Sequence, residues 1–363
     1  MHDRGTAEVR DPAPPNPGVV VTVGVDTHAA FHVAAVVDQL GRLLGSLAIP
    51  TTLDGYTELL AWAEGLGQVG CFAIEGTGSW GAGLTRWLTA NGQAVVEVPR
   101  PDRARRRRKG KSETLDAEAA ARAALAGLDV VIPKRQDGPV EMIRALRVAR
   151  RSAMKARIQA GNQLLGLLTR APEELRARLW KLRGRNLVEV ALRLEPAAGV
   201  PVSVTAATEV ALWELAGRWH GLDGEITRLD ELLDALVRKL APDLLALPGV
   251  GTETAAALLE AAGDNPGRLV SEAAFGHLCG AAPILASSGR TIRHGFNPGG
   301  HREANEALWR IVLVRMKSHT PTRVYVERRT AEGLSKREIM RCLKRYVARE
   351  VYRYLRPTNG TLE

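Results

Sequence analysis

Aromatic residues are scarce in this chain of 363 residues, since Phe, Trp and Tyr together make up only 4% of it. Proteins that hold unpaired bases by stacking need exposed rings gathered on one surface. The composition therefore argues against base stacking as the main way in which the chain would bind a nucleic acid.

Long apolar runs and closely spaced cysteines are also missing. No run approaches the roughly 20 apolar residues of a membrane-spanning helix, and the N-terminus has no signal-peptide core. Cys71, Cys279 and Cys342 are too far apart for a metal-binding pair or a disulfide framework. We therefore expect a cytoplasmic protein with no membrane partner, and a loose polar tail at residues 1–17.

Positive charge, by contrast, is plentiful and concentrated. The formal net charge is +10, with eight bases against one acid in residues 100–111 and 17 against 6 in residues 289–356. Two basic blocks on a balanced background predict a polyanionic partner, although a solvated surface with a basic tail is the alternative. The residues of the first block that we expect to contact nucleic acid are Arg103, Arg105, Arg106, Arg107, Arg108 and Lys109.

The first third of the chain alternates short apolar runs with helical patterns. Strands are predicted at residues 18–25, 32–37, 43–49, 71–76 and 94–99, and helices after Thr52, at 81–90 and at 116–126. The order βββαβαβα predicts a mixed α/β sheet with helices on its faces, in the order of a ribonuclease-H-like fold.

The middle of the chain has a different pattern. Between Leu212 and Leu240, nine apolar residues follow one another at alternating steps of three and four, and smaller residues keep the same steps between Leu146 and Leu167. This predicts a coiled coil or a long helical hairpin. The arginines at 144–157 are predicted to face outward, where they could touch a phosphate backbone.

The last third is predicted to be mainly helical. The stretch LPGVG at 247–251 resembles the turn of a helix-hairpin-helix, in which Gly249 and Gly251 would present backbone N–H groups to a phosphate; a plain helix–turn–helix joint is the alternative. A basic helix near the C-terminus has apolar positions on one face, which we expect to be buried, at Ile339, Leu343, Tyr346, Val347, Val351 and Leu355.

Four acids stand where the predicted sheet would bring them together. Asp26 and Glu75 follow the first and fourth strands, and Glu113 and Asp116 share one face at a helix start. Four converging carboxylates would repel one another unless cations lay between them, and hard oxygen ligands suit Mg²⁺. One or two Mg²⁺ ions could hold the oxygens of a phosphoryl transfer.

Two serines, Ser287 and Ser288, occur in the stretch LASSGRTIRHGFNPGGHR at 285–302. Neither has a histidine or an acid at a spacing that suggests a local hydrolase triad. Taken alone, the stretch is most simply a polar turn.

Several stretches together resemble the DEDD transposases of bacterial insertion sequences, the IS110 family. The resemblance runs from about residue 20 to 356, and the stretches that carry it are VGVDTH, AIEGTGSWG, KSETLDAEAAARAAL, LPGVGTETA and APILASSGRTIRHGFNPGGHREAN. It implies a RuvC-like domain joined by a coiled coil to a C-terminal transposase domain. It also implies donor and target DNA, a structured guide RNA (the bridge RNA), a dimer or tetramer, and a place in the bacterial nucleoid.

Position by position, the resemblance makes Asp26, Glu75, Glu113 and Asp116 the acidic tetrad and Ser288 the nucleophile. Arg290 and Arg293 would then face the same phosphate. One position departs from the family, because the third acid is usually aspartate and here is Glu113. Two alternatives follow: a metal nuclease or junction resolvase that uses water, and a catalytically impaired copy that binds RNA and DNA.

Together, the patterns and the resemblance predict four regions along the chain. Residues 1–17 form the tail, 18–135 the RuvC-like domain, 136–242 the coiled-coil linker, and 243–363 the C-terminal domain with the helix-hairpin-helix and the serine.

Overall fold

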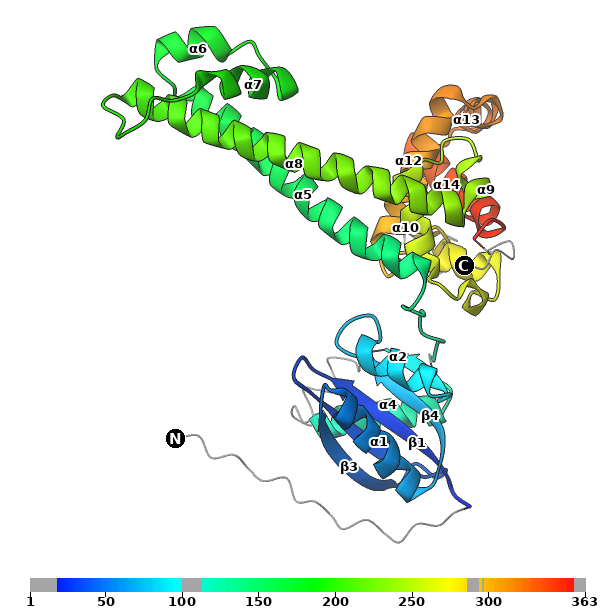
Figure 1. The fold of residues 1–363 in the computed structure, drawn as a ribbon. Coiled ribbons are helices and arrows are strands. Elements are labelled where there is room, and N and C mark those ends of the chain that lie inside the picture. Colours follow the sequence, from blue (N-terminus) through cyan, green and yellow to red (C-terminus); the bar gives the residue numbers. More distant parts are fainter. Residues whose placement is uncertain (1–17, 100–112, 129, 286–293, 296, 356–363) are drawn as a thin grey trace. The chain divides into compact units, whose positions relative to one another are not determined.

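The structure is a computed structural model, and it describes residues 18–99, 113–128, 130–285, 294–295 and 297–355 (Figure 1). The chain divides into two compact units. The first comprises residues 1–138 together with 262–270, and the second comprises 139–261 together with 271–363. The two units are described one after the other.

The first unit contains a five-stranded sheet and its helices, in the order predicted from the sequence. The elements are β1 (Val20–Thr27), β2 (Phe31–Val37), β3 (Leu43–Pro50), α1 (Leu53–Leu66), β4 (Gln68–Glu75), α2 (Ala82–Ala90), β5 (Val95–Val98) and α4 (Glu113–Leu125). The predicted start of α1 is confirmed, because the Thr52 side chain accepts a hydrogen bond from the Gly55 N–H at 3.2 Å.

The sheet has the strand order β3-β2-β1-β4-β5. β1, β2 and β3 pair antiparallel, whereas β4 pairs parallel to both β1 and β5. The sheet is therefore mixed, as the sequence predicted, and its order is that of a ribonuclease-H-like fold. β1 and β4 are neighbours at its centre, so their carboxyl ends lie side by side.

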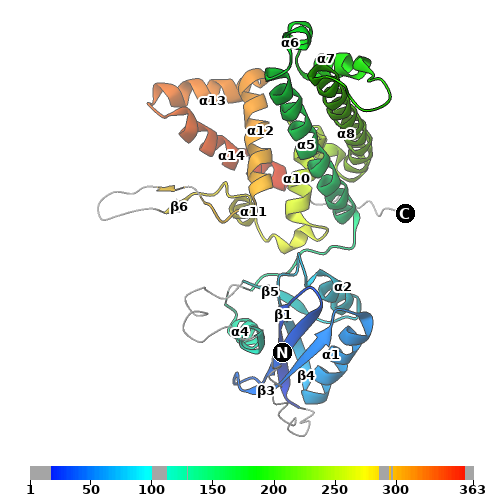
Figure 2. The same ribbon diagram turned by 90° about the vertical axis from the view of Figure 1, so that its left-hand side faces the viewer.

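The two faces of the sheet are covered differently (Figure 2). Alternate residues of β1 and β4, including Val23, Val25 and Phe72, belong to a large apolar core beneath α1 and α2. The opposite face is covered by α4, whose small residues Ala117 and Ala120 pack against β2, β4 and β5. Side chains alternate between the faces of a strand, so each strand residue is assigned to one layer or the other.

The second unit is mainly helical. Its elements are α5 (Pro139–Thr169), α6 (Glu173–Leu179), α7 (Gly184–Ala191), η1 (Leu192–Leu194), α8 (Val204–Leu240), α9 (Pro242–Leu245), α10 (Thr252–Ala262), α11 (Glu272–Leu278), β6 (Ile284–Leu285), β7 (His294–Gly295), α12 (Arg302–Ser318), α13 (Thr320–Ala331) and α14 (Lys336–Tyr352). A further short helix, η2 (Pro266–Arg268), lies in the segment that belongs to the first unit. None of the helices described here is long and apolar enough to cross a membrane.

The long helices α5 and α8 run side by side (Figure 1). Their seam buries Leu212 and Leu233 of α8 and Ala153 and Ala160 of α5, all predicted seam residues. The prediction for α5 is wrong at Ala149 and Gln163, which are exposed; Leu164 and Leu168 are buried near its C-terminal end instead. Straight helices have 3.6 residues per turn, so a strict 3.5-residue pattern drifts off the contact line over their length.

Of the remaining helices, α12 packs against α13 and α14, and α14 also packs against α11. α10 is almost wholly buried, and α14 buries Ile339, Leu343, Val347 and Val351 along one face, as predicted. The prediction is wrong for Tyr346, which is 54% exposed. Its ring meets the ring of Tyr325 of α13 edge-on, at 5.7 Å between centroids.

Candidate active site

Two of the predicted acids lie at neighbouring strand ends on one face of the sheet. The last register pair of β1 and β4 joins Val25 and Ile74, and Asp26 and Glu75 follow it directly. Val25 and Ile74 face α1 and α2, so the alternation turns Asp26 and Glu75 to the α4 side. Both are buried, with 7% and 5% of their surface exposed. The fold therefore places these two acids at one edge of the sheet, and their role as metal ligands stays a prediction.

The other two acids lie in the first turn of α4, which begins at Glu113. Glu113 and Asp116 are three residues apart and so share one side of the helix. Carboxylates in a first helical turn are stabilised by the N–H groups that have no partner within the helix.

A glycine in β1 allows α4 to pack closely on the sheet. A Cβ atom added to Gly24 would lie 2.0 Å from the Ala117 carbonyl oxygen and 2.4 Å from the Ala121 nitrogen. No side chain fits there, so the helix backbone rests directly on the strand. Gly24 is two residues before Asp26 and faces the same side, so this contact fixes the helix on the face that carries Asp26 and Glu75.

A histidine that the sequence analysis did not assign lies among these acids. The His28 Nε2 atom is 3.2 Å from Asp26 Oδ2 and 3.6 Å from Glu113 Oε1. The backbone of His28 is held by a hydrogen bond from its N–H to Nδ1 of buried His32, at 3.3 Å. His28 therefore connects an acid of β1 to an acid of α4.

The loop after Glu75 is tied to the end of β1. The Thr27 hydroxyl donates a hydrogen bond to the Glu75 carbonyl at 2.8 Å. The next residue, Gly76, has φ +70°, and its carbonyl accepts from the N–H groups of Ser79 and Gly81. The left-handed backbone favours glycine here and turns the chain sharply away, which leaves the Glu75 side chain at the strand end.

The carboxylates fit a divalent cation by their chemistry. Their oxygens are the ligands that hard cations such as Mg²⁺ prefer. In the described part of the chain, however, no three His, Cys, Asp or Glu side chains are arranged as a ready set of metal ligands. A cation between Asp26 and Glu113 would compete with His28 for their oxygens, so binding would require these side chains to rearrange.

The predicted nucleophile and the first basic block lie outside the described residues. Ser287, Ser288, Arg290 and Arg293 fall in 286–293, and Arg103, Arg105, Arg106, Arg107, Arg108 and Lys109 fall in 100–112. The flanks of the serine segment are described, because β6 and β7 pair antiparallel with Leu285 opposite His294.

The predicted helix-hairpin-helix turn joins α9 to α10. Gly249 has φ +74°, and a Cβ there would lie 3.1 Å from the Ile311 carbonyl of α12. Arg315 also holds this turn, donating from Nε to the Pro248 carbonyl at 2.7 Å. Gly251 is exposed, and its N–H donates to the Thr254 hydroxyl at 3.0 Å. The turn is therefore fixed on α12 with Gly251 at the surface.

The prediction that the α5 arginines face a phosphate backbone is wrong for several of them. Arg147 is 2% exposed and forms ion pairs with Glu253, Glu260 and Glu303. Arg150 pairs with Asp230 of α8 and Arg157 with Asp223. These acids lie far along the chain, where no helical spacing could reveal them.

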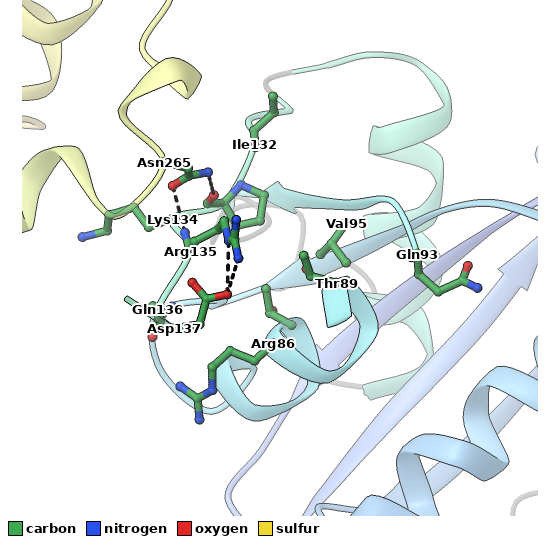
Figure 3. A pocket seen from close by; sticks show the side chains of 12 residues that line it. Arg86, Thr89, Gln93, Val95, Ile132, Lys134, Arg135, Gln136, Asp137 and Asn265 are labelled. Carbon is green, nitrogen blue, oxygen red and sulfur yellow. Dashed lines mark hydrogen bonds and ion pairs between the residues drawn. The ribbon is translucent and has the colours of Figure 1, made fainter. Parts of the chain in front are cut away.

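A separate cavity of about 160 Å³ lies beside α2 in the first unit (Figure 3). Asn265, from the segment 262–270, accepts a hydrogen bond from the Arg135 N–H at 2.9 Å and donates one to the Pro133 carbonyl at 3.0 Å. None of the four predicted acids lines this cavity. It is therefore distinct from the candidate active site.

Comparisons with known proteins agree with these features. A profile described as "Transposase", of the DEDD type found in IS110, matches residues 23–172, and one described as "Transposase IS116/IS110/IS902 family" matches residues 241–327. The first match includes all four acids.

Two curated relatives come from insertion elements. The chain is 27% identical to the uncharacterized 42 kDa protein of IS900 from Mycobacterium paratuberculosis, over 86% of this chain and 90% of that protein. It is 30% identical to the uncharacterized 43.6 kDa protein of IS110 from Streptomyces coelicolor, over 37% of this chain and 34% of that protein. Taken with the two profile matches, these likenesses show that the chain belongs to the IS110 family of insertion-sequence transposases.

Proposed function

We propose that the chain cleaves and rejoins DNA strands through a covalent bond between Ser288 and DNA. The observation that carries this proposal is the placement of Asp26 and Glu75 at adjacent strand ends, on the face covered by the helix that bears Glu113 and Asp116. Such a group of carboxylates suits phosphoryl transfer, in which negative charge on the phosphate must be neutralised.

The proposed reaction exchanges one phosphate ester for another. The Ser288 oxygen attacks phosphorus, its proton leaves to water, a bond from serine to phosphorus forms, and the bond to one sugar oxygen of the strand breaks. That sugar oxygen takes up a proton. In rejoining, the hydroxyl of a new strand end attacks the phosphoserine and releases Ser288. The ester bond is conserved, so no ATP is required.

The acids have a supporting role in this reaction. Asp26, Glu75, Glu113 and Asp116 would hold one or two Mg²⁺ ions, which would supply positive charge next to the phosphate. The carboxylates orient the phosphate by fixing that charge on the sheet face. Serine needs such assistance because its neutral hydroxyl is a poor nucleophile.

The partners in this proposal are nucleic acids and further copies of the chain. Donor and target DNA are the substrates, a structured bridge RNA would choose them, and Gly249 and Gly251 would contact a phosphate. The α5–α8 pair would serve as the coiled coil of a dimer or tetramer, because exchange of several strands needs several active sites. RNA sequencing of the purified protein tests the guide, and mass measurement in solution tests the assembly.

The central test is a suicide DNA substrate supplied with cognate RNA and Mg²⁺, followed by a denaturing gel and peptide mapping. We expect an adduct at Ser288 that Ser288→Ala abolishes and that the matched variant Ser287→Ala retains. Cleavage by Ser288→Ala at the wild-type rate would instead identify a nuclease that uses water.

The same assay tests the departure at Glu113. Glu113→Asp restores the shorter acid that is usual in the family, so cleavage should equal or exceed that of the starting protein. A metal titration that showed no binding to the starting protein would favour an impaired copy that only binds RNA and DNA.

A further inference from the structure

One helix of the second unit carries a row of arginines on its outer side. They follow one another at intervals of four residues along α14 and its C-terminal cap, and all are exposed: Arg337, Arg341, Arg345, Arg349 and Arg353. The buried residues Ile339, Leu343, Val347 and Val351 each stand two positions later. Two residues of an α-helix turn by about 200°, so the arginines point away from the core.

The two acids of α14 accept their hydrogen bonds from groups outside this row. Glu338 caps the helix start by accepting from the Ser335 N–H at 2.9 Å. Glu350 accepts from Arg315 Nη1 of α12 at 2.6 Å. Both carboxylates thus form these hydrogen bonds with groups outside the row, although Glu338 also attracts Arg341 electrostatically.

Three exposed arginines on other helices of this unit are paired with acids. Arg238, Arg310 and Arg328 each pair with an acid four residues away on the same helix. Within the row, Arg349 pairs with Glu272 of α11 at 2.7 Å, and among the described residues no ion pair is found for the other four. The row is therefore an excess of positive charge rather than part of an ordinary mixed surface.

Two arginines of the row line a cleft next to the residues that precede β6. Arg345 and Arg349 line this cleft of about 310 Å³ together with His277, Ala282 and Pro283, and Glu272 is its acidic member. Pro283 directly precedes β6, one of the two short strands that flank residues 286–293. Arginines of α14 thus lie beside the chain that leads to Ser288.

We propose that this arginine row binds the phosphate backbone of a DNA duplex next to the strand being cut. The inference rests on the proposed function, because Ser288, which follows β6 in the sequence, is what makes DNA the expected occupant. The row offers one guanidinium per 6 Å or so of helix, since each residue rises about 1.5 Å. Guanidinium groups bind phosphates with paired hydrogen bonds and without regard to base sequence.

The experiment measures how duplex binding depends on salt. Fluorescence anisotropy with a short labelled DNA duplex is compared for the wild type, for Arg341→Gln with Arg345→Gln, and for Arg310→Gln with Arg328→Gln. The two double variants lose the same charge from exposed positions. If both row arginines contact phosphates, the slope of log affinity against log salt falls by about 2, since each contact contributes roughly 0.9. The control variant should keep the wild-type slope.

The outcomes separate this inference from the proposed function. A wild type that binds duplex DNA with a steep slope, and row variants that keep that slope, would overturn the row as a DNA surface and leave the proposed function standing. A row effect seen only with a stem-loop RNA of similar length would overturn the assignment to DNA. A wild type without affinity for duplex DNA would overturn both. Arg337→Gln with Arg353→Gln repeats the test at the ends of the row.

Discussion

Acidic side chains are grouped around a different nitrogen-bearing side chain in each unit. In the first unit, His28 lies between Asp26 and Glu113, and 28% of its side chain is exposed. In the second, Arg147 lies among Glu253, Glu260 and Glu303 with 3% of its side chain exposed. A guanidinium remains charged at all ordinary pH values, whereas the charge of a histidine depends on its protonation. The acids around Arg147 therefore form a permanently charged structural cluster, whereas the acids around His28 form a site where a metal cation could bind.

The largest expected effect tests the acids of the first unit. Asp116→Asn should reduce strand cleavage on the order of a thousandfold, because it removes a carboxylate that would hold Mg²⁺ in the proposed function. Glu118→Gln is a matched control on the same helix, since Glu118 pairs with Arg122 rather than with the site. If the two variants cleaved the suicide substrate equally well, Asp116 would have no greater role in cleavage than Glu118.

The second prediction tests the ion cluster of the second unit. Arg147→Ala should lower the free energy of unfolding by about 3–5 kcal/mol, because it removes the buried guanidinium that pairs with the buried carboxylate of Glu260. Arg144→Ala, which removes a more exposed pair with Glu141 on the same helix, should cost less than about 0.5 kcal/mol. Urea denaturation measures both, and similar losses would show that Arg147 is not central to the unit.

The third prediction concerns the contact that holds α4 on the sheet. Gly24→Ala places a methyl group 2.0 Å from a backbone oxygen, so the helix must move. We expect a loss of about 1–3 kcal/mol in unfolding free energy, together with slower cleavage. Gly65→Ala in α1 meets no atom within 4 Å and should be neutral or slightly stabilising. A Gly24→Ala protein with unchanged stability and cleavage would contradict the close packing.

The smallest effect concerns the histidine behind His28. Burial lowers the pKa of His32 from its ordinary value of 6.5. The unfolded chain therefore takes up a proton more readily, so the stability from this group is complete above pH 6.5 and declines as the pH falls below it. Melting curves recorded across this pH range should show that the melting temperature of His32→Asn falls less with falling pH than that of the wild type. His220→Asn, at an exposed position, is the control. If both variants kept the wild-type dependence of melting temperature on pH, His32 would not be the group responsible.

Local pattern was enough to predict the sheet and its acids. Apolar runs end at Asp26 and Glu75, and the order of elements along the chain is that of a ribonuclease-H-like fold, in which the first and fourth strands are neighbours. His28 could have been found from the same pattern, because it stands two residues after Asp26 and so on the same side of an extended chain. A histidine at a strand end nevertheless looks the same in sequence as buried His32, which packs against Tyr56.

The arginines of α5 show what local pattern could not give. Arg147 is 156 residues from Glu303, and Arg157 is 66 residues from Asp223. Helical spacing shows which residues share a side but not which acid will lie opposite them. The basic residues of α5 therefore led to the prediction of a phosphate partner, whereas in the fold several of them pair with carboxylates of the same chain.

The segment 262–270 prevents the two units from being separated by a single cut in the chain. The chain passes between the two units at 138, at 261 and again at 270, so the first unit is completed by residues from the middle of the second. Asn265 contributes hydrogen bonds to the Arg135 N–H and the Pro133 carbonyl that a fragment ending at residue 138 would lack. A protease cut at any one of these passages would leave the two halves joined by the other two.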